Sequence, residues 1–213
     1  MPYSTENIGT RTFNINNPQG TPTKAFIFNH GITGNATYVA QQLNNPDPAN
    51  YYLVFPDGSP IPNEPDLNKR MWNSSGGILS LIEAGFFGQI INHLNGLGVT
   101  EIYIGGHSNG AIMASYLVAT YPDYFSGAVF VSGYLHNNIT NVAGGDIPIR
   151  HIHGINDLIV PAVGQNYNVA DHLKKFMNAG NFVKGELLPT DHSLANLNSD
   201  NFIIDTIEEI MGL

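Results

Sequence analysis

The chain has 213 residues, no cysteine and a formal net charge of −9, with 17 acidic side chains against 8 Lys and Arg. This length fits one domain with a sizeable core, and we expect a single domain over residues 1–213. The lack of cysteine excludes disulfides, thiolate metal sites and a cysteine nucleophile. The shortage of Lys and Arg argues against a nucleic-acid partner, because phosphate neutralisation needs clustered cations.

Targeting signals and membrane spans are not evident in the sequence. Residues 1–17 lack the basic region and apolar core of a signal peptide, and no apolar run approaches the roughly 20 residues that cross a bilayer. We therefore expect a cytoplasmic protein with no membrane span, while a secreted mature form would also fit. The oligomeric state has no signature in the sequence.

Short β-prone runs alternate with helical segments along the chain. The expected strands cover residues 10–15 (an edge strand), 24–29, 51–55, 101–104, 128–131, 148–153 and 182–188. The expected helices cover residues 36–43, 78–97, 109–121, 164–179 and 201–211. This alternation predicts an α/β fold with a mostly parallel central sheet and helices on both faces. In such sheets ligands bind beyond the carboxyl ends of the strands.

A nucleophile pattern follows the expected strand 101–104. The segment Gly105-Gly106-His107-Ser108-Asn109-Gly110 contains Gly-x-Ser-x-Gly. A strand that turns abruptly into a helix holds the serine in strained backbone geometry with its hydroxyl exposed, and neighbouring backbone passes too close for large flanking side chains. We predict that Ser108 is a nucleophile. The alternative is a Gly-rich turn that only packs.

A serine hydroxyl attacks well only when a base takes its proton and an acid orients that base. Asp157 follows the expected strand 148–153, and His192 follows the last expected strand, so both belong to the sheet edge of Ser108. We predict Asp157 as the acid and His192 as the base. Asp191 is a competing acid, but consecutive loop residues rarely face each other.

An oxyanion hole needs two donors, and we assign the backbone amides of Asn109 and Ile32, the second in the Gly-rich loop 29–34. His151 and His153 lie on one face of an expected strand and could be interpreted as a metal pair, but no third ligand is near and packing is the better account. We expect no metal and no organic cofactor.

Several of these segments together resemble a serine α/β-hydrolase over most of the chain. They are His30-Gly31, Gly106-His107-Ser108-Asn109-Gly110, His153-Gly154-x-x-Asp157 with Val160-Pro161, and His192. More narrowly, Val54-Phe55-Pro56-Asp57-Gly58, Trp72-Asn73 and Ser108-Asn109-Gly110 resemble the polyhydroxybutyrate depolymerase / feruloyl esterase family. The resemblance implies hydrolysis of carboxylic esters through an acyl-enzyme, with hydroxyalkanoate or feruloyl esters as candidate substrates. Ile32 and Met71 stand where members of that family often carry cysteine.

Substrate selection is expected from loops 59–77 and 133–145, where Trp72 and Tyr134 are candidate substrate-binding residues. Their alternative role is packing of the loops. Neither loop is long enough for a large helical lid, so an open site for a small-molecule or polymeric ester is expected. The rival functions are a small lidless carboxylesterase or acyl-thioesterase and, less favoured because Ser108, Asp157 and His192 are all present, a non-catalytic hydrolase-fold binding module.

Overall fold

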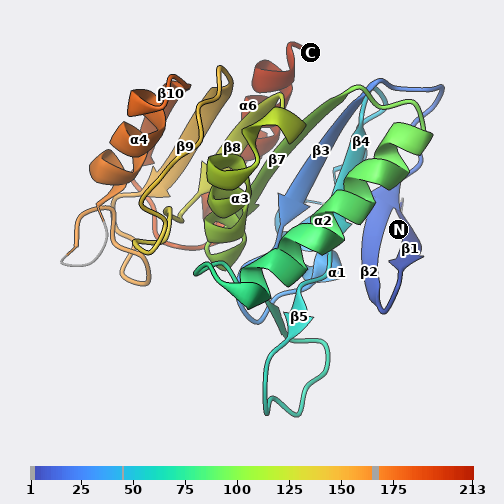
Figure 1. Cartoon of the computed structure of the whole chain (residues 1–213), viewed down its shortest axis with the longest axis horizontal. Helices are drawn as coiled ribbons and strands as arrows, with labels where there is room; N and C mark the ends of the chain where they lie inside the picture. Colours follow the sequence, from blue (N-terminus) through green and yellow to red (C-terminus); the bar gives the residue numbers. More distant parts are fainter. Residues whose placement is uncertain (1–2, 45, 165–167) are drawn as a thin grey trace.

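The computed structural model describes residues 3–44, 46–164 and 168–213, and its centre is one eight-stranded sheet (Figure 1). The strand order is β1-β2-β4-β3-β7-β8-β9-β10. Pairings β1–β2 and β2–β4 are antiparallel, and all the others are parallel. The strands are β1 (Tyr3–Ile8), β2 (Arg11–Asn16), β3 (Lys24–Asn29), β4 (Tyr52–Pro56), β7 (Glu101–His107), β8 (Gly127–Val131), β9 (Pro148–Gly154) and β10 (Phe182–Leu188).

Helices cover both faces of this sheet, as the alternation of elements predicts. One core cluster joins the sheet to α2 (Ile78–Gly96), α3 (Asn109–Thr120) and α4 (Val169–Asn178). A second cluster, on the other face, joins it to α1 (Ala36–Gln42), α5 (Leu194–Leu197) and α6 (Phe202–Met211). The described residues also form two short 3₁₀ turns, η1 (Pro122–Tyr124) and η2 (Ser199–Asn201).

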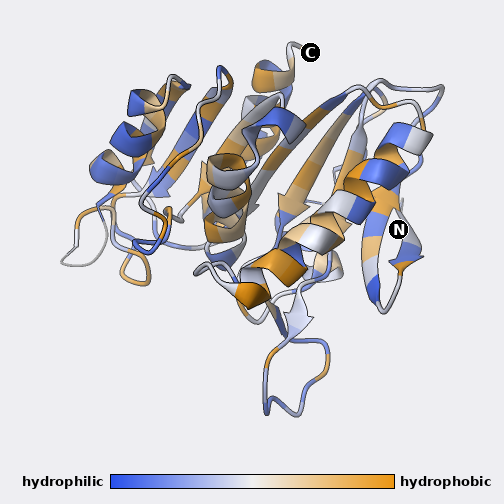
Figure 2. Ribbon diagram, viewed as in Figure 1, coloured by the Kyte–Doolittle hydropathy of each residue, from blue (hydrophilic) through white to orange (hydrophobic). Residues whose placement is uncertain are grey.

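Hydrophobic residues form the central strands because a parallel strand is covered on both faces. Every residue of β8 is buried, and the central strands carry far more hydrophobic colour than α4, whose outer face is hydrophilic (Figure 2). Among residues 3–44, 46–164 and 168–213, no helix combines the length and the apolar character needed to cross a bilayer.

Several elements differ from the sequence-based expectation, among them the short helix α5, which was expected as loop. β1 was not expected, because its sequence Tyr-Ser-Thr-Glu-Asn-Ile has no apolar pattern. It forms the edge of the sheet, so β2, which was expected as the edge strand, lies inside the sheet. The loop 59–77 contains the two-stranded hairpin β5 (Ser59–Pro60) and β6 (Arg70–Met71). Helix α4 begins at Val169, not at residue 164, because the Asn168 side chain caps it; residues 165–167 of the expected helix lie outside the described part.

The parallel strands deliver the predicted site residues to one edge of the sheet. Ser108 directly follows β7, Asp157 follows β9 by three residues and His192 follows β10 by four. Since β7, β8, β9 and β10 are consecutive neighbours and all parallel, their carboxyl ends lie at this same edge.

Candidate active site

Ser108 occupies a strained turn between β7 and α3. Its φ of 54° and ψ of −121° lie in a region that residues with a side chain rarely adopt. Its N–H donates to the Val131 carbonyl at 2.9 Å, and its carbonyl accepts from the Ile112 N–H at 3.0 Å, so both ends of the turn are fixed. A Cβ at Gly110 would lie 2.4 Å from the carbonyl oxygens of Asn29 and His30, which explains the glycine.

His192 and Asp157 form a close pair beside this turn. Nδ1 of His192 lies 2.6 Å from Oδ2 of Asp157, whose side chain is fully buried. The other carboxylate oxygen accepts hydrogen bonds from the amides of Ile159 at 2.9 Å and Val160 at 2.8 Å. Burial alone would raise the pKa of Asp157, but the hydrogen bonds from His192 and the two amides outweigh it and lower that pKa.

The competing acid, Asp191, has a different role. Its Oδ1 accepts from the backbone N–H of Ser193 at 2.9 Å and from Nδ2 of Asn196 at 3.1 Å, and these bonds are exposed. They close the turn that leads into α5. Asp191 therefore orders the loop that carries His192, while Asp157 is the carboxylate in contact with the imidazole.

Two further histidines contact this pair, and the sequence analysis assigned neither of them to it. Nε2 of His107 donates to the His192 carbonyl at 2.8 Å, with ring centroids 4.7 Å apart. Nε2 of His153 lies 2.6 Å from the Val160 carbonyl and 3.4 Å from Oδ2 of Asp157. Desolvation lowers the pKa of both rings, that of His107 to about 4, so both are neutral at pH 7. The sequence offered one signal for each ring: His107 directly precedes Ser108, and His153 lies four residues before Asp157.

The loop after β3 lies against the nucleophile. A Cβ at Gly31 would lie 3.4 Å from Cβ of Ser108. Ile32, the next residue, is 54% exposed. Asn109 opens α3, so its amide belongs to the N-terminal end of the helix dipole. Both predicted oxyanion donors thus come from elements adjacent to Ser108.

Ser108 and His192 line one open cavity of about 490 Å³. It is bounded by the loop after β3, by α1 and by the segments around Asp157 and His192. The lining residues are Gly31, Ile32, Thr33, Tyr38, Val39, Gln42, His107, Ser108, Ile159, His192, Ser193 and Leu194. Five lining residues offer apolar surface, which suits an apolar portion of a ligand: Ile32, Tyr38, Val39, Ile159 and Leu194.

A family model described as phospholipase/carboxylesterase matches residues 10–198. The chain belongs to this family. The prediction of an α/β-hydrolase ester hydrolase is thereby confirmed. The closer likeness to polyhydroxybutyrate depolymerases and feruloyl esterases stays a prediction. No curated protein matches the sequence.

Solved structures share the fold of this phospholipase/carboxylesterase-family chain at low identity. A Bacillus cereus carboxylesterase is 15% identical with a TM-score of 0.71, over 93% of this chain and 95% of that one. Esterase PE8 is 16% identical with a TM-score of 0.72, over 97% and 100%. A Pyrococcus horikoshii acylaminoacyl peptidase is 13% identical with a TM-score of 0.63, over 97% of this chain but 41% of its own length.

The two aromatic residues predicted to bind substrate lie outside the cavity of this family member. Trp72 is 1% exposed, its Nε1 donates to the His30 carbonyl at 2.9 Å, and its ring packs against His30 and Phe87. In this position the indole holds the loop 59–77 to the body, which is the packing role that the sequence analysis gave as the alternative. Tyr134 is half-buried after β8, and it too is absent from the lining of the cavity beside Ser108.

The paired histidines of β9 pack against each other. Nε2 of His151 lies 3.1 Å from Nδ1 of His153, with the rings stacked at an interplanar angle of 9°. Within the described part of the chain, no group of three or more His, Cys, Asp or Glu side chains is arranged to hold a metal ion.

Proposed function

We propose that this chain is a serine esterase that works through an acyl-enzyme, with Ser108 as nucleophile, His192 as general base and Asp157 as the orienting acid. The observation that carries the proposal is the 2.6 Å contact between Asp157 and His192, beside a serine held in strained geometry on the same cavity. We take residues 1–213 as one catalytic domain.

The proposed chemistry follows from these positions. Because Nδ1 of His192 is bonded to Asp157, Nε2 is left to take the proton of Ser108 as Oγ attacks the ester carbonyl carbon. The carbonyl electrons move to oxygen, and the amides of Ile32 and Asn109 bind the oxyanion. When the tetrahedral intermediate collapses, the C–O bond to the alcohol breaks and His192 protonates the leaving oxygen. Water then repeats the sequence and releases the acid from Ser108.

The cavity supports an ester with an apolar acyl or alcohol group. Tyr38, Val39, Ile159 and Leu194 offer apolar surface, and among the described residues no Lys or Arg lines the cavity to bind an anionic group. The open form of the site fits hydroxyalkanoate or feruloyl esters, as the sequence resemblance implies. The family match favours equally a small carboxylesterase or acyl-thioesterase without a lid.

Covalent labelling tests the proposed chemistry. A fluorophosphonate probe is expected to label the protein once, at Ser108, and Ser108→Ala is expected to abolish labelling and to reduce p-nitrophenyl ester hydrolysis by about 10⁴-fold or more, since the nucleophile is lost. Circular dichroism of the variant serves as the control for folding. Near-wild-type turnover by Ser108→Ala would refute the proposal, and an unlabelled wild type would indicate a binding module.

A substrate panel distinguishes the narrower assignments. The panel contains p-nitrophenyl esters of increasing chain length, an acyl thioester, methyl ferulate and a hydroxybutyrate oligomer. A kcat/KM that is highest for the oligomer or the ferulate supports the narrower resemblance. A preference for simple alkyl esters or for the thioester supports the lidless carboxylesterase or acyl-thioesterase instead.

A further inference from the structure

Residues 70–72, on and directly after β6, contact both elements that carry the proposed oxyanion donors. The backbone of Arg70 pairs with the loop after Ile32: Thr33 N–H donates to the Arg70 carbonyl at 2.8 Å, and Arg70 N–H donates to the Gly34 carbonyl at 3.1 Å. Thr33 has a φ of 66°, a left-handed conformation that is costly for a β-branched residue. The loop around Ile32 is therefore held in a conformation that it would not adopt alone.

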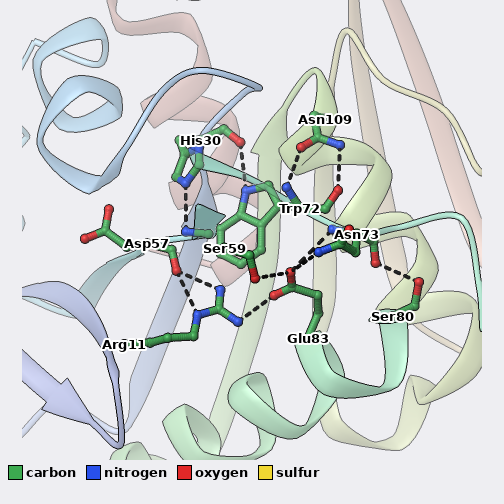
Figure 3. Close-up of polar contacts among 10 residues, drawn as sticks. Arg11, His30, Asp57, Ser59, Trp72, Asn73, Ser80, Glu83 and Asn109 are labelled. Carbon is green, nitrogen blue, oxygen red and sulfur yellow. Dashed lines mark hydrogen bonds and ion pairs between the residues drawn. The ribbon is translucent and has the colours of Figure 1, made fainter. Parts of the chain in front are cut away.

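Trp72 makes the second half of this connection (Figure 3). Its backbone exchanges two hydrogen bonds with the side chain of Asn109: Trp72 N–H donates to Oδ1 at 2.7 Å, and Nδ2 donates to the Trp72 carbonyl at 3.1 Å. Its indole Nε1 donates to the carbonyl of His30, two residues before Ile32. One residue thus joins the start of α3 to the loop after β3.

A buried ion pair between Arg11 and Glu83 holds the residues that flank Trp72 in place. Glu83 of α2 is fully buried, and its Oε2 accepts from Nη1 of Arg11 at 2.6 Å. Its Oε1 accepts from Ser59 Oγ at 2.8 Å and from Asn73 Nδ2 at 3.0 Å, so it holds both the β5 strand and the residue after Trp72 (Figure 3). A buried carboxylate with these partners resists displacement, because any shift leaves charge unpaired.

We infer that Trp72 is a positioning residue for the proposed oxyanion hole, setting the distance between the amides of Ile32 and Asn109 through its bonds to His30 and to the Asn109 side chain. This inference rests on the proposed function. It explains why the lone tryptophan is buried beneath the site instead of lining it. Oxyanion donors act only when they are held at the right distance before the reaction, so the contribution of Trp72 belongs to the transition state.

The closing experiment uses Trp72→Phe, which removes the indole N–H but keeps an aromatic ring in the core. Its kcat per fluorophosphonate-titrated site is expected to fall about 10- to 100-fold with KM within about twofold, because a displaced donor weakens transition-state binding but not substrate binding. Inhibition by a trifluoromethyl ketone, whose adduct with serine carries an oxyanion, is expected to weaken by a similar factor.

Two further variants separate positioning from general stability. Asn109→Ala breaks the link to the Trp72 backbone at a half-buried first-turn position and keeps the amide, so the same signature is expected even if Trp72→Phe does not fold. Phe125 belongs to the same core cluster but lies just before β8 begins, at the strand ends remote from Ser108. Phe125→Leu is expected to lower the melting temperature without changing kcat per titrated site.

The outcomes are distinguishable. Unchanged kcat per site and unchanged ketone inhibition in folded Trp72→Phe, or in Asn109→Ala, would overturn the positioning role and leave the proposed esterase intact. A wild-type protein that neither labels nor binds the ketone would overturn the proposed function itself.

Discussion

Asp157 accepts hydrogen bonds from three donors, and only one of them comes from the proposed base. The amides of Ile159 and Val160 hold one carboxylate oxygen, which leaves the other directed at Nδ1 of His192. This arrangement fixes the tautomer of the imidazole, because the nitrogen that faces a carboxylate carries the proton. The adjacent segment 158–160 thus orients the proposed acid, which in turn orients the proposed base.

The first prediction follows from this geometry. Asp157→Asn is expected to lower kcat for a p-nitrophenyl ester by about 10³- to 10⁴-fold, since an amide can present its N–H to Nδ1 and favour the wrong tautomer. Asp191→Asn is the matched control, one residue from His192, and its kcat is expected to stay within about threefold because Asp191 only closes an exposed turn. A larger loss in Asp191→Asn would show that the acid is assigned incorrectly.

Individual residues were predictable from sequence where chain order limits geometry. Ser108, Asp157 and His192 each follow a strand, and parallel strands bring such positions to one edge. Trp72 was not predictable, since a tryptophan in a long loop packs inward or lines a pocket according to neighbours distant in sequence. Here those neighbours are His30, on β3's following loop, and Phe87, on α2.

At the scale of elements, the close approach of α3 to the end of β3 decides the geometry of the site. Gly110 is in the first turn of α3, and a Cβ there would meet the carbonyl oxygens of Asn29 and His30 at 2.4 Å. Those residues lead into the loop that carries Ile32. The strand, the helix and the loop are therefore in direct backbone contact at Gly110.

Gly110→Ala is expected to lower the free energy of unfolding by about 3 kcal/mol and to lower kcat per titrated site, because the methyl group pushes α3 away from β3. The matched control is Gly85→Ala in α2, where a Cβ meets nothing within 4 Å. This change is expected to stabilise the protein by about 0.5–1 kcal/mol through helix propensity. Urea titration and active-site titration measure both effects. Equal stability of the two variants would contradict the packing argument.

Strong apolar runs made the strands predictable, and weak local signals explain the differences. β3 and β10 have the expected bounds because turn residues or breaks flank both segments. β1 has no apolar pattern and exists because it pairs with β2 over six positions. Helix α4 starts late because Asn168 accepts from the Ala170 amide, a local cap that competes with an earlier start. Pairing between strands and helix capping thus account for most of the differences between the expected and the observed elements.

At the scale of the whole molecule, several titratable side chains are buried in the interior. His30, His151, His153 and His172 are almost fully buried, as is Glu83. Glu83 has a cationic partner, whereas His30 and His172 are buried as neutral rings: His30 accepts from the Gly58 amide, and His172 accepts from the Leu135 amide. The sequence predicted that His151 and His153 lie on one strand. It did not predict that His30 and His172 are buried too, because that depends on how the helices pack on the sheet.

This burial makes the stability of the fold depend on pH. Desolvation lowers the pKa of His30 to about 4 and that of His172 to about 3, and it lowers the pKa of His151 far below its usual value. In the unfolded chain each histidine has a pKa of about 6.5. Between these values the unfolded chain binds more protons than the folded one, so the free energy of unfolding decreases as the pH falls below about 6.5.

The last prediction is the size and the origin of this loss. His30, His151 and His172 are each expected to remove about 2 kcal/mol between pH 7.5 and pH 5, because a full proton difference is worth about 1.4 kcal/mol per pH unit. Asp157 does not contribute in this window, since its lowered pKa means that its stabilisation is lost only below about pH 4. His172→Asn keeps an acceptor for the Leu135 amide but cannot be protonated, so urea titrations of this variant should show a pH-dependent loss smaller by about 2 kcal/mol. If wild type and His172→Asn lose the same free energy between pH 7.5 and pH 5, buried neutral His172 is not a source of the acid sensitivity.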